Sequence, residues 1–526
     1  MRFKFRGKKV RDRQPKSPGA NTPKSNRGRP GGKGPNVVVA SAEAFRALRL
    51  HFPRLPDGLW NSLVSNFAAS FKQMAKRLSQ AFEDGIDQQL LPLLEHGIPQ
   101  EVQKLGRGIC EATLCENRGF CGSRLQDANG VELKYQGDRQ RTILTPLGHI
   151  NFRRSYYLGR ERAGEAERAV ACYPLDVWLG LDGEHGILPG LQEHMALLAS
   201  RTSYPDALSI LKSLLPVPKL CLRSIERVCT TIAQNAADFR ESDLAKGTPP
   251  SCNVGEKTGV SFLCVDGGMV PVRDDDEKHK EVKMAVLGRL RRRLLKQRKS
   301  DNETEVYNKL YFAHLGRADP LFERLALEYF RQGFAQSKVL HVVADMAAWI
   351  WRRVPELLQE GQELSLLYDF YHAKERLTIL TNLLFEAGSL QAKAELELLL
   401  TKLLADDRDE FFSHLSGYFE LFQSQKLDAA SEALTFFHNH RSMLRYSECQ
   451  KLGYPIGSGM VEGAVKFVLK DRCCRSGMRW KRPGAEDILQ LRCIYASGQW
   501  DFFVERRKSE RRKTQMAQIA RWQMSR

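Results

Sequence analysis

The sequence predicts a multidomain α+β protein built around a mixed α/β sheet, with an all-helical insertion inside the domain that carries this sheet. From about residue 258 the hydrophobic pattern alternates between short strands and helices, which is typical of a sheet with crossover connections. Residues 373–453 contain no proline and several leucine-rich stretches, which favours helices. Residues 105–178 show the pattern of short strands separated by turn residues, which predicts a separate small β module.

The sheet domain is expected in two parts, at 251–372 before the insertion and at 454–503 after it. Apolar runs bounded by turn residues mark its strands, and amphipathic spacing marks its helices. The predicted strands are 261–266, 281–288, 309–315, 339–344 and 364–369, and the predicted helices are 319–333 and 347–358.

Three acidic residues follow or open these elements. Asp266 and Asp345 each end an apolar run, and Glu462 opens a helical stretch. Ligands of open α/β sheets gather at the carboxyl ends of strands. Carboxylates collected there can hold a pair of Mg²⁺ or Mn²⁺ ions roughly 3.5–4 Å apart, the apparatus of in-line phosphoryl transfer. The pattern predicts a polynucleotidyl transferase, and Gly267 and Gly268 would leave room for metal or phosphate.

Asp369 and His372 end the last predicted strand and begin a helix. Side chains one turn apart share a helix face. The pair could hydrogen-bond a phosphate or support a metal-bound carboxylate. A structural role for the histidine is the alternative.

The positive charge is concentrated at the two ends of the chain. Residues 1–34 carry twelve Lys or Arg against one Asp, and residues 505–526 carry eight against two Glu, so little of the net +19 belongs to the rest. Such arms suit sequence-independent binding of phosphates. Solvated tails that improve solubility are the alternative. We expect a disordered basic arm at 1–40 and a basic tail at 504–526.

Two further basic features are candidates for DNA contact. Residues 179–250 are predicted to be helical, with a helix pair that places Arg223 and Arg227 at the exposed start of its second helix, as in a helix-turn-helix. The segment 288–299 has seven basic residues and no acidic ones. It is predicted to be a loop whose Arg291, Arg292 and Arg293 hold a DNA backbone. Ordinary bundle helices and a solvated face are the respective alternatives.

The N-terminal region is expected to combine helix and sheet. An apolar stripe from Trp60 to Ile86 predicts an amphipathic helix within the helical segment 41–104, more typical of core than of a partner surface. A hairpin is expected through Pro146 and Gly148 in the β module. The gaps between its cysteines do not match the paired spacings of a structural zinc site, so buried or idle thiols are expected, and a zinc site is the alternative. These thiols are Cys110, Cys115, Cys121 and Cys172.

Composition favours a soluble, cytoplasmic protein, associated with the nucleoid when bound to DNA. The scattered cysteines do not form a disulfide framework, which favours a reducing compartment. The sequence lacks an uninterrupted apolar run of ~18 to 20 residues, so no membrane partner is expected.

Several sequence blocks around the acidic residues resemble those of a known protein family. The blocks Gly457-Ser-Gly-Met-Val-Glu462 and Lys470-Asp-Arg-Cys-Cys-Arg-Ser-Gly-Met-Arg-Trp480, together with the segments around Asp266, Asp345 and Asp369, resemble Mutator-like bacterial insertion-sequence transposases of the Kra type. The resemblance spans about 140 to 503, and the cluster around Glu462 is its most specific part.

The resemblance implies an RNase H-like catalytic core with an acidic DDE triad, two Mg²⁺ ions and transposition on terminal inverted repeats. It makes Asp266, Asp345 and Glu462 the metal ligands, and it matches Asp369 and His372 to the family's Asp-x-x-His element. The sequence departs from the family in lacking the paired-cysteine zinc ribbon, so the resemblance makes the β module at 105–178 a degenerate, zinc-ribbon-like module. The sequence also lacks the glycine usual after the second acid.

Within the second block, Arg475, Arg479 and Trp480 are candidates for DNA contact. Trp480 could stack on a base extruded during cleavage. A buried Trp that packs the helix against the sheet is the alternative.

The partners implied are element ends and target DNA, bound by a homodimer or higher oligomer. Two other function classes stay open, a structure-directed nuclease that cuts without joining and a non-catalytic DNA-binding regulator.

Overall fold

A computed structural model describes residues 47–523 except 85–89, 127–129, 164–165, 182–185, 247–258, 274–276, 295–301, 406–407 and 426–427. The predicted basic arm at 1–40 lies outside the described residues. The chain divides into two compact units, residues 1–65 and 66–526. In the first unit, Arg49 pairs with Asp57 at 3.0 Å, at the start of helix α2 (Asp57–Asp84).

In the second unit, the remainder of α2 lies against helix α4 (Ile98–Glu116), which follows the short π-helical turn η1 (Leu93–Gly97). The Arg77 guanidinium pairs with the buried Glu101 carboxylate at 3.1 Å. Helix α4 extends past residue 104, so the start of the expected β module is helical instead. The apolar stripe expected as core is exposed in part, at Phe67, Phe71, Leu78 and Phe82.

The small β module is a four-stranded antiparallel sheet with the order β1-β2-β3-β4. The strands are β1 (Arg124–Gln126), β2 (Glu132–Thr145), β3 (Gly148–Ala163) and β4 (Ala166–Cys172), followed by helix α5 (Pro174–Trp178). The predicted hairpin is confirmed, since Thr145 pairs with Gly148 across its turn. Gly148 has φ +105°, a conformation that favours glycine.

The cysteines of this region do not gather at one place, and Cys115 is exposed. Cys110 packs against the cluster of Ile143 and Phe152, whereas Cys121 and Cys172 pack against a different cluster around Tyr157. Among the residues that the structure describes, no group of three or more His, Cys, Asp or Glu side chains is placed to hold a metal ion.

Three helices follow, α6 (Pro189–Arg201), α7 (Tyr204–Leu214) and α8 (Leu222–Ala245). The predicted helix pair is therefore present as α7 and α8. Ser203 caps α7 by accepting a hydrogen bond from the Asp206 N–H at 3.2 Å. The predicted apolar face of α8 is buried, at Ile225, Val228, Cys229, Ile232 and Ala236.

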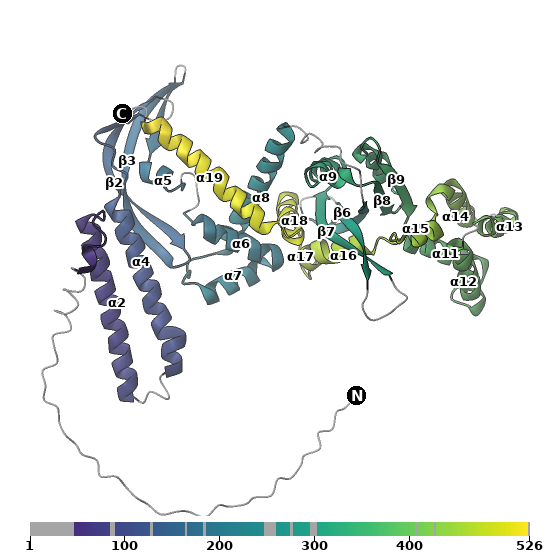
Figure 1. Cartoon of the computed structure of the whole chain (residues 1–526), viewed down its shortest axis with the longest axis horizontal. Coiled ribbons are helices and arrows are strands. Elements are labelled where there is room, and N and C mark those ends of the chain that lie inside the picture. The colour runs from purple at the N-terminus through teal and green to yellow at the C-terminus, as the bar shows by residue number, and fades with distance from the viewer. Residues whose placement is uncertain are drawn as a thin grey trace, which may run out of the picture. The chain divides into compact units, whose positions relative to one another are not determined.

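The central sheet has five strands in the order β7-β6-β5-β8-β9 (Figure 1). Strand β6 lies antiparallel to both of its neighbours, β5 and β7, and β8 and β9 run parallel to β5. All five predicted strands are confirmed, with bounds β5 (Val260–Pro271), β6 (His279–Leu294), β7 (Asn302–Leu315), β8 (Val339–Ala344) and β9 (Glu363–Tyr368).

The expected basic loop was wrong over residues 289–294. Strand β6 continues to Leu294 and pairs with β7, so Arg291 lies opposite Glu305. Opposite charges across neighbouring strands stabilise the pairing and allow the strand to continue through a basic run.

Each face of the central sheet packs against helices. On one face, Leu263 and Val265 join the core of α9 (Asp319–Arg331) and α10 (Ala348–Arg353), helices that the sequence predicts. The one-turn helices η2 (Phe334–Gln336) and η3 (Val354–Leu357) lie in the same part of the chain. On the other face, Phe262 and Cys264 join a cluster that includes the segment after the insertion.

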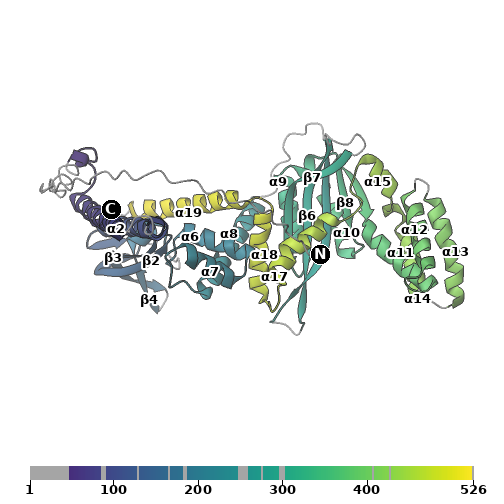
Figure 2. The same cartoon turned by 90° about the horizontal axis from the view of Figure 1, so that it is seen from below.

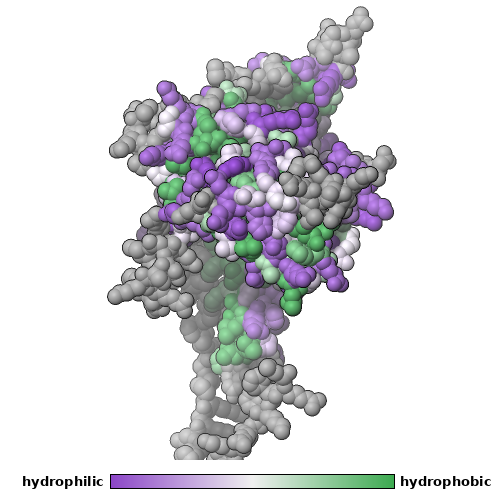
Figure 3. Space-filling view, turned by 90° about the vertical axis from the view of Figure 1, so that its right-hand side faces the viewer, coloured by the Kyte–Doolittle hydropathy of each residue, from purple (hydrophilic) through white to green (hydrophobic). Residues whose placement is uncertain are grey.

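The insertion is all-helical, as the leucine-rich composition predicts. Figure 2 shows its helices beyond the β8 and β9 side of the sheet, and Figure 3 shows a largely hydrophilic face there with scattered hydrophobic residues. The helices are α11 (Phe370–Leu384), α12 (Leu390–Leu404), α13 (Asp409–Gln425), α14 (Asp428–Asn439), η4 (Arg441–Met443) and α15 (Tyr446–Leu452).

After the insertion the chain returns to the sheet as one nearly continuous helical stretch and then ends in two long helices. The elements are α16 (Gly459–Ala464), the π-helical η5 (Val465–Lys470), α17 (Asp471–Cys473), α18 (Arg482–Ala496) and α19 (Trp500–Gln523).

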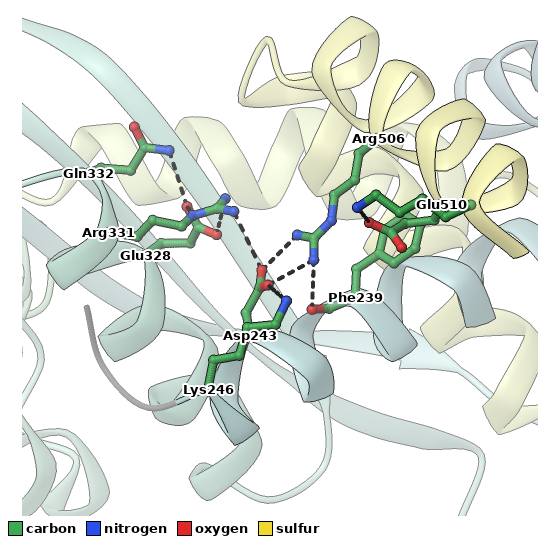
Figure 4. A network of polar contacts seen from close by, with 9 residues as sticks. Phe239, Asp243, Lys246, Glu328, Arg331, Gln332, Arg506 and Glu510 are labelled. Atoms are coloured by element: carbon green, nitrogen blue, oxygen red, sulfur yellow. Dashed lines mark hydrogen bonds and ion pairs between the residues drawn. The ribbon is translucent and has the colours of Figure 1, made fainter. Parts of the chain in front are cut away.

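Two arginines of the predicted basic tail lie in helix α19 and bind the chain itself. Arg506 makes two short contacts to the Asp243 carboxylate, at 2.6 and 2.7 Å, and Arg331 of α9 approaches the same carboxylate at 3.6 Å (Figure 4). Arg507 is buried and pairs with Glu193 at 3.2 Å. These tail arginines therefore fasten α19 to its own chain.

Candidate active site

Three aspartates lie on one level of three neighbouring strands. The parallel pairing of β5, β8 and β9 ends at Val265, Ala344 and Tyr368, which face one another in register. The next residue in each strand direction is Asp266, Asp345 and Asp369, respectively. Strand β5 itself continues beside β6 to Pro271, so the expectation that Asp266 ends a strand is corrected. Because neighbouring strands lie ~4.8 Å apart, the backbone brings the three carboxylates to the same edge of the sheet.

The three aspartates also continue one face of the sheet. Side chains alternate between the faces of a strand, so Asp266 follows Cys264, Asp345 follows Val343 and Asp369 follows Leu367. The residues that precede the aspartates on that face belong to one core cluster.

Helix α16 covers this same face. Val461 is buried in the same cluster as Cys264, and the nearby Val461 backbone partly offsets the burial that raises the pKa of the Cys264 thiol. Glu462 is the next residue along α16 and is half-buried. The helix therefore carries the glutamate to the face on which the aspartates lie.

The electrostatics of Asp266 place the acids near one another. Burial raises the pKa of the Asp266 carboxyl, whereas the Gly267 N–H, which donates to Asp266 Oδ1 at 2.7 Å, lowers it. The negative charges of Asp345 and Glu462 raise this pKa and His372 lowers it, with a net upward shift. An acid next to like charges resists ionisation.

The turn after β8 is held by hydrogen bonds, although it lacks the glycine that the family resemblance leads one to expect after Asp345. Asp345 Oδ1 accepts the Ala347 N–H at 3.0 Å, and the Trp351 indole N–H donates to the Asp345 carbonyl at 2.7 Å. Trp349 packs beneath the Lys283 ammonium at 4.3 Å. The two hydrogen bonds from Ala347 and Trp351 hold Asp345 in place. Its second carboxylate oxygen has no hydrogen bond to the described residues.

Asp369 differs from the other two aspartates. It is fully buried, and its Oδ1 accepts the His372 N–H at 2.9 Å as the cap of α11. Its Oδ2 accepts the Ser458 N–H. Both oxygens are thus occupied by backbone donors, and the expected contact to phosphate would have to displace one. His372 is half-buried and lies 3.3 Å from Glu375.

Gly268 has a packing role in place of the ligand clearance expected from sequence. A Cβ atom at Gly268 would come within 2.4 Å of a Leu469 methyl and 3.3 Å of a Val465 methyl. The glycine therefore lets η5 approach strand β5. At Gly267 the corresponding atom would meet the Glu281 carboxylate at 2.8 Å.

The residue types fit a hard divalent cation, although the described residues do not form a finished metal site. Asp266, Asp345 and Glu462 supply carboxylate oxygens, the ligands that Mg²⁺ and Mn²⁺ take in proteins. A bound cation would offset the burial and repulsion that raise the pKa of Asp266. We therefore regard these three side chains as the residues able to hold such an ion.

The candidate DNA contacts fall into two groups. Arg223 and Arg227 are exposed in the first turns of α8, and Arg479 is exposed before α18. Arg475 is exposed, donates to the Asp471 carbonyl and lies 3.9 Å from Asp206. By contrast, Arg291 pairs with Glu305 at 2.9 Å and stacks on Tyr307. The side chains of Arg292 and Arg293 lie outside the described residues.

The structure favours packing over base stacking for Trp480. Its ring is 8% exposed, and its indole N–H donates to the Cys473 carbonyl at 2.9 Å. Its rings face Tyr204 at 6.1 Å and the Arg472 guanidinium at 4.8 Å. An extruded base could reach this ring only after the helix junction opened, so the stacking interpretation is corrected.

Two buried arginines that the sequence did not single out hold the Glu462 segment to α6. Arg472 donates to the Ala199 carbonyl at 2.8 Å, and Arg492 donates to the Ser200 and Val468 carbonyls at 2.5 and 2.6 Å. Carbonyls at the end of a helix favour positive charge. Local sequence gives no signal for such residues, because a basic residue in a helix normally indicates a solvated face.

Comparison with known proteins places the chain beside uncharacterised sequences. A model of an uncharacterised protein family, UPF0236, matches residues 87–382. This range includes Asp266, Asp345 and Asp369 and ends before Glu462. A Streptococcus gallolyticus protein described as "UPF0236 protein in vanSb 3'region" is 23% identical over 389 residues, which cover 71% of this chain and 76% of that protein.

One solved structure similar to this chain is titled "Drosophila P element transposase strand transfer complex". The match has 12% identity and a TM-score of 0.21, and it covers 60% of this chain and 80% of that one. A TM-score of this size does not establish a shared fold. Separately, none of the helices in the described residues combines the length and apolarity that crossing a bilayer requires.

Proposed function

The chain belongs to the uncharacterised protein family UPF0236, and we propose that this member is a DNA transposase that cleaves and joins DNA strands with the help of divalent cations. The observation that carries the proposal is the placement of Asp266 and Asp345 on one level of two parallel strands, with Glu462 on a helix over the same face. The raised pKa of Asp266, caused first by burial and then by the negative charges of Asp345 and Glu462, supports it.

The form of the central sheet also supports the proposal. Three consecutive antiparallel strands are followed by two parallel strands joined through helices. This is the sheet expected of the RNase H-like core to which the sequence resemblance points, and the helical insertion lies between the second and third acids of the proposed triad. The Mutator-like, Kra-type assignment is part of the same proposal.

The proposed chemistry assigns separate tasks to the acids. A pair of Mg²⁺ or Mn²⁺ ions would activate the attacking water or 3′-hydroxyl and stabilise the departing 3′-oxygen. Asp266, Asp345 and Glu462 would hold the ions and fix their position relative to the scissile phosphate. Because Asp266 is partly buried, its negative charge would act with little screening by solvent. The carboxylates need not act as proton acceptors themselves.

DNA is the proposed partner. The exposed arginines at the start of α8 and before α18 would contact phosphates of the element ends, which the resemblance suggests are terminal inverted repeats. The sequence of the first 34 residues would add a salt-dependent, sequence-independent contribution to binding. A homodimer or higher oligomer would match two paired ends with two active sites.

The test is metal-dependent cleavage and joining of labelled DNA that carries the element ends flanking this gene. We expect the wild-type protein to join strands only with Mg²⁺ or Mn²⁺, and Asp266→Asn to abolish joining while DNA binding is retained. Asp319→Asn, on the half-exposed first turn of α9, is the matched control and should join normally.

The same assay separates the alternative functions. Cleavage that never leads to joining would identify a nuclease. Binding without cleavage by either protein would identify a regulator. Equal joining by wild type and Asp266→Asn would remove Asp266 from the chemistry and overturn the proposal.

A further inference from the structure

Asp369 stands level with Asp266 and Asp345, yet its surroundings are those of a structural acceptor. It is 0% exposed, and both carboxylate oxygens accept backbone N–H groups. A carboxylate that already accepts two such bonds has little to offer a cation or a phosphate. Metal or phosphate binding therefore does not explain why Asp369 lies level with the proposed metal ligands.

The Ser458 N–H bound by Asp369 belongs to the residue from which α16 begins. The Ser458 carbonyl in turn accepts the N–H of Val461 at 2.8 Å and the N–H of Glu462 at 3.2 Å. Two consecutive hydrogen bonds thus lead from the Asp369 carboxylate to the Glu462 backbone. They cross between segments that are 89 residues apart in sequence.

Neighbouring contacts hold the same returning segment against the ends of the strands. The Phe370 N–H donates to the Ile456 carbonyl at 3.1 Å. A Cβ atom at Gly457 would come within 2.7 Å of the Tyr371 ring and 3.8 Å of Asp369 Oδ2. Gly457 therefore permits the close approach that brings the Ser458 N–H to Asp369.

A buried histidine fixes the beginning of the segment. His341 Nε2 lies 2.8 Å from the Pro455 carbonyl, and His341 Nδ1 lies 3.0 Å from Ser365 Oγ. Because a carbonyl can only accept, Nε2 carries the proton and Nδ1 accepts from the serine. Burial lowers the pKa of His341 to about 4, so the ring stays neutral in this role.

We propose that Asp369 is a positioning residue that latches the Glu462 helix to the level of Asp266 and Asp345, and that it does not bind metal or phosphate itself. The catalytic consequence rests on the proposed transposase function, whereas the latch itself is a property of the fold. The all-helical insertion separates Glu462 from the sheet in sequence, and the latch re-attaches the chain where the insertion ends.

The latch is tested with two substitutions that keep the cap of α11. Asp369→Asn is isosteric and can still accept the His372 N–H, but it then presents an amide NH₂ to the Ser458 N–H. Asp369→Ser can also cap the helix, but it is too short to accept from both donors. Ser458→Ala is the matched control, because it keeps the backbone N–H and removes a buried hydroxyl that has no hydrogen-bond partner among the described residues.

Hydrogen exchange followed by mass spectrometry gives a readout that does not depend on activity. We expect amides in peptides covering 456–463 to exchange roughly tenfold faster or more in both Asp369 variants, because the local opening loses its restraint. Ser458→Ala should exchange like wild type. Unchanged exchange in both Asp369 variants would overturn the latch, whatever the outcome of the DNA assay.

Mn²⁺ binding by titration distinguishes a latch from a ligand. Loss of a residue that orients a metal ligand typically weakens binding about 10- to 100-fold. If Asp369 acts through Glu462, then Asp369→Asn should cause no further loss in a Glu462→Gln background. Additive losses would instead make Asp369 a direct ligand and overturn the proposal. If wild type binds no Mn²⁺, the proposed function fails, and the exchange experiment alone decides the latch.

Discussion

Asp266 and Asp345 occupy equivalent positions on neighbouring parallel strands, each directly after the last paired residues, Val265 and Ala344. The two strands part at this point, because β5 continues its pairing with β6 alone. The two carboxylates lie side by side at this fork, and no backbone hydrogen bonds between the strands separate them. Burial raises the pKa of Asp266, the neighbouring charge of Asp345 raises it further, and a cation bound at the fork would offset both effects.

We predict that Asp266→Asn stabilises the metal-free protein near neutral pH. The pKa of Asp266 is raised in the fold by burial and by Asp345 and Glu462. Ionisation of the carboxyl therefore lowers the free energy of unfolding. The loss begins as the pH rises past the pKa of Asp266 in the unfolded chain, and it is complete above its pKa in the folded protein. The melting temperature of the variant should therefore exceed that of wild type at pH 7.

Two controls accompany this measurement. Below the unfolded pKa of about 3.9 the carboxyl is neutral in both states, so the difference should vanish there. Added Mn²⁺ should raise the melting temperature of wild type and leave Asp266→Asn nearly unchanged, because a ligand stabilises only a fold that binds it. A variant that melts below wild type at pH 7 without metal would contradict the prediction.

Glu486 should show the opposite dependence on pH. Burial by itself would raise the pKa of Glu486, but the hydrogen bond to His314, the Arg324 and His314 charges and the Leu315 N–H bring it from 4.5 to about 2. Its stabilisation is complete above the unfolded value and is lost as the pH falls from 4.5 toward 2. Glu486→Gln should therefore lose about 3 kcal/mol at pH 7.

The loss in Glu486→Gln should shrink when unfolding is measured at pH 3 in place of pH 7. Asp487→Asn is the matched control. Burial raises the pKa of Asp487 although Thr230 donates to it at 2.8 Å, so its removal should not lower stability at pH 7. A loss in Glu486→Gln that does not change with pH would show that the contacts matter through shape and not through charge.

We predict that Arg223 and Arg227 contribute to DNA affinity in a salt-dependent way. Each phosphate contact adds about one unit to the slope of log K against log salt concentration. The double variant Arg223→Gln, Arg227→Gln should lower that slope by up to about two, without a change in melting temperature, because both side chains are exposed. Fluorescence anisotropy with labelled duplex DNA over a salt series measures this slope.

Arg506→Gln is the control for that series. Its guanidinium is paired with Asp243 inside the fold. The control should melt earlier and keep the wild-type salt slope. Equal slopes for wild type and the α8 double variant would exclude the start of α8 as a phosphate-binding surface.

Trp480 is predicted to act through stability. Removal of a buried Trp side chain typically costs about 3–5 kcal/mol, and Trp480 also donates to the Cys473 carbonyl. Trp480→Ala should therefore unfold at lower denaturant, and Trp480→Phe should lose less because it keeps an aromatic ring. Loss of strand joining by Trp480→Phe with near wild-type stability would restore the base-stacking interpretation.

The local hydrophobic pattern was sufficient to predict the strands of the central sheet. Its apolar runs predicted all five strands. Asp345 follows the end of β8 as expected, whereas β5 continues past Asp266 to Pro271. Strand ends follow from short-range information, namely where an apolar run stops. The alignment of the two acids does not, because it depends on which strands become neighbours.

The errors concern partners that are distant in sequence. Arg507 reads as part of a solvated basic tail, yet its partner Glu193 is 314 residues away. Gly268 reads as clearance for a ligand, yet the space is filled by Leu469. Asp369 reads as a possible phosphate contact, yet it accepts from Ser458. Periodicity reports which face of an element is buried and not what buries it, so these roles could not be assigned from sequence.

The exposed part of the α2 stripe leads to a prediction about assembly. Phe71 is 52% and Phe82 70% exposed, and large exposed apolar side chains aligned on one helix face are typical of a surface that binds a partner. If this face joins two copies of the chain, Phe71→Glu should convert the dimer to monomer without lowering the melting temperature. Light scattering after size exclusion measures the mass. Leu390→Glu, at an 85% exposed site in the insertion, should leave it unchanged, and a Phe71→Glu protein that stays dimeric would exclude this face.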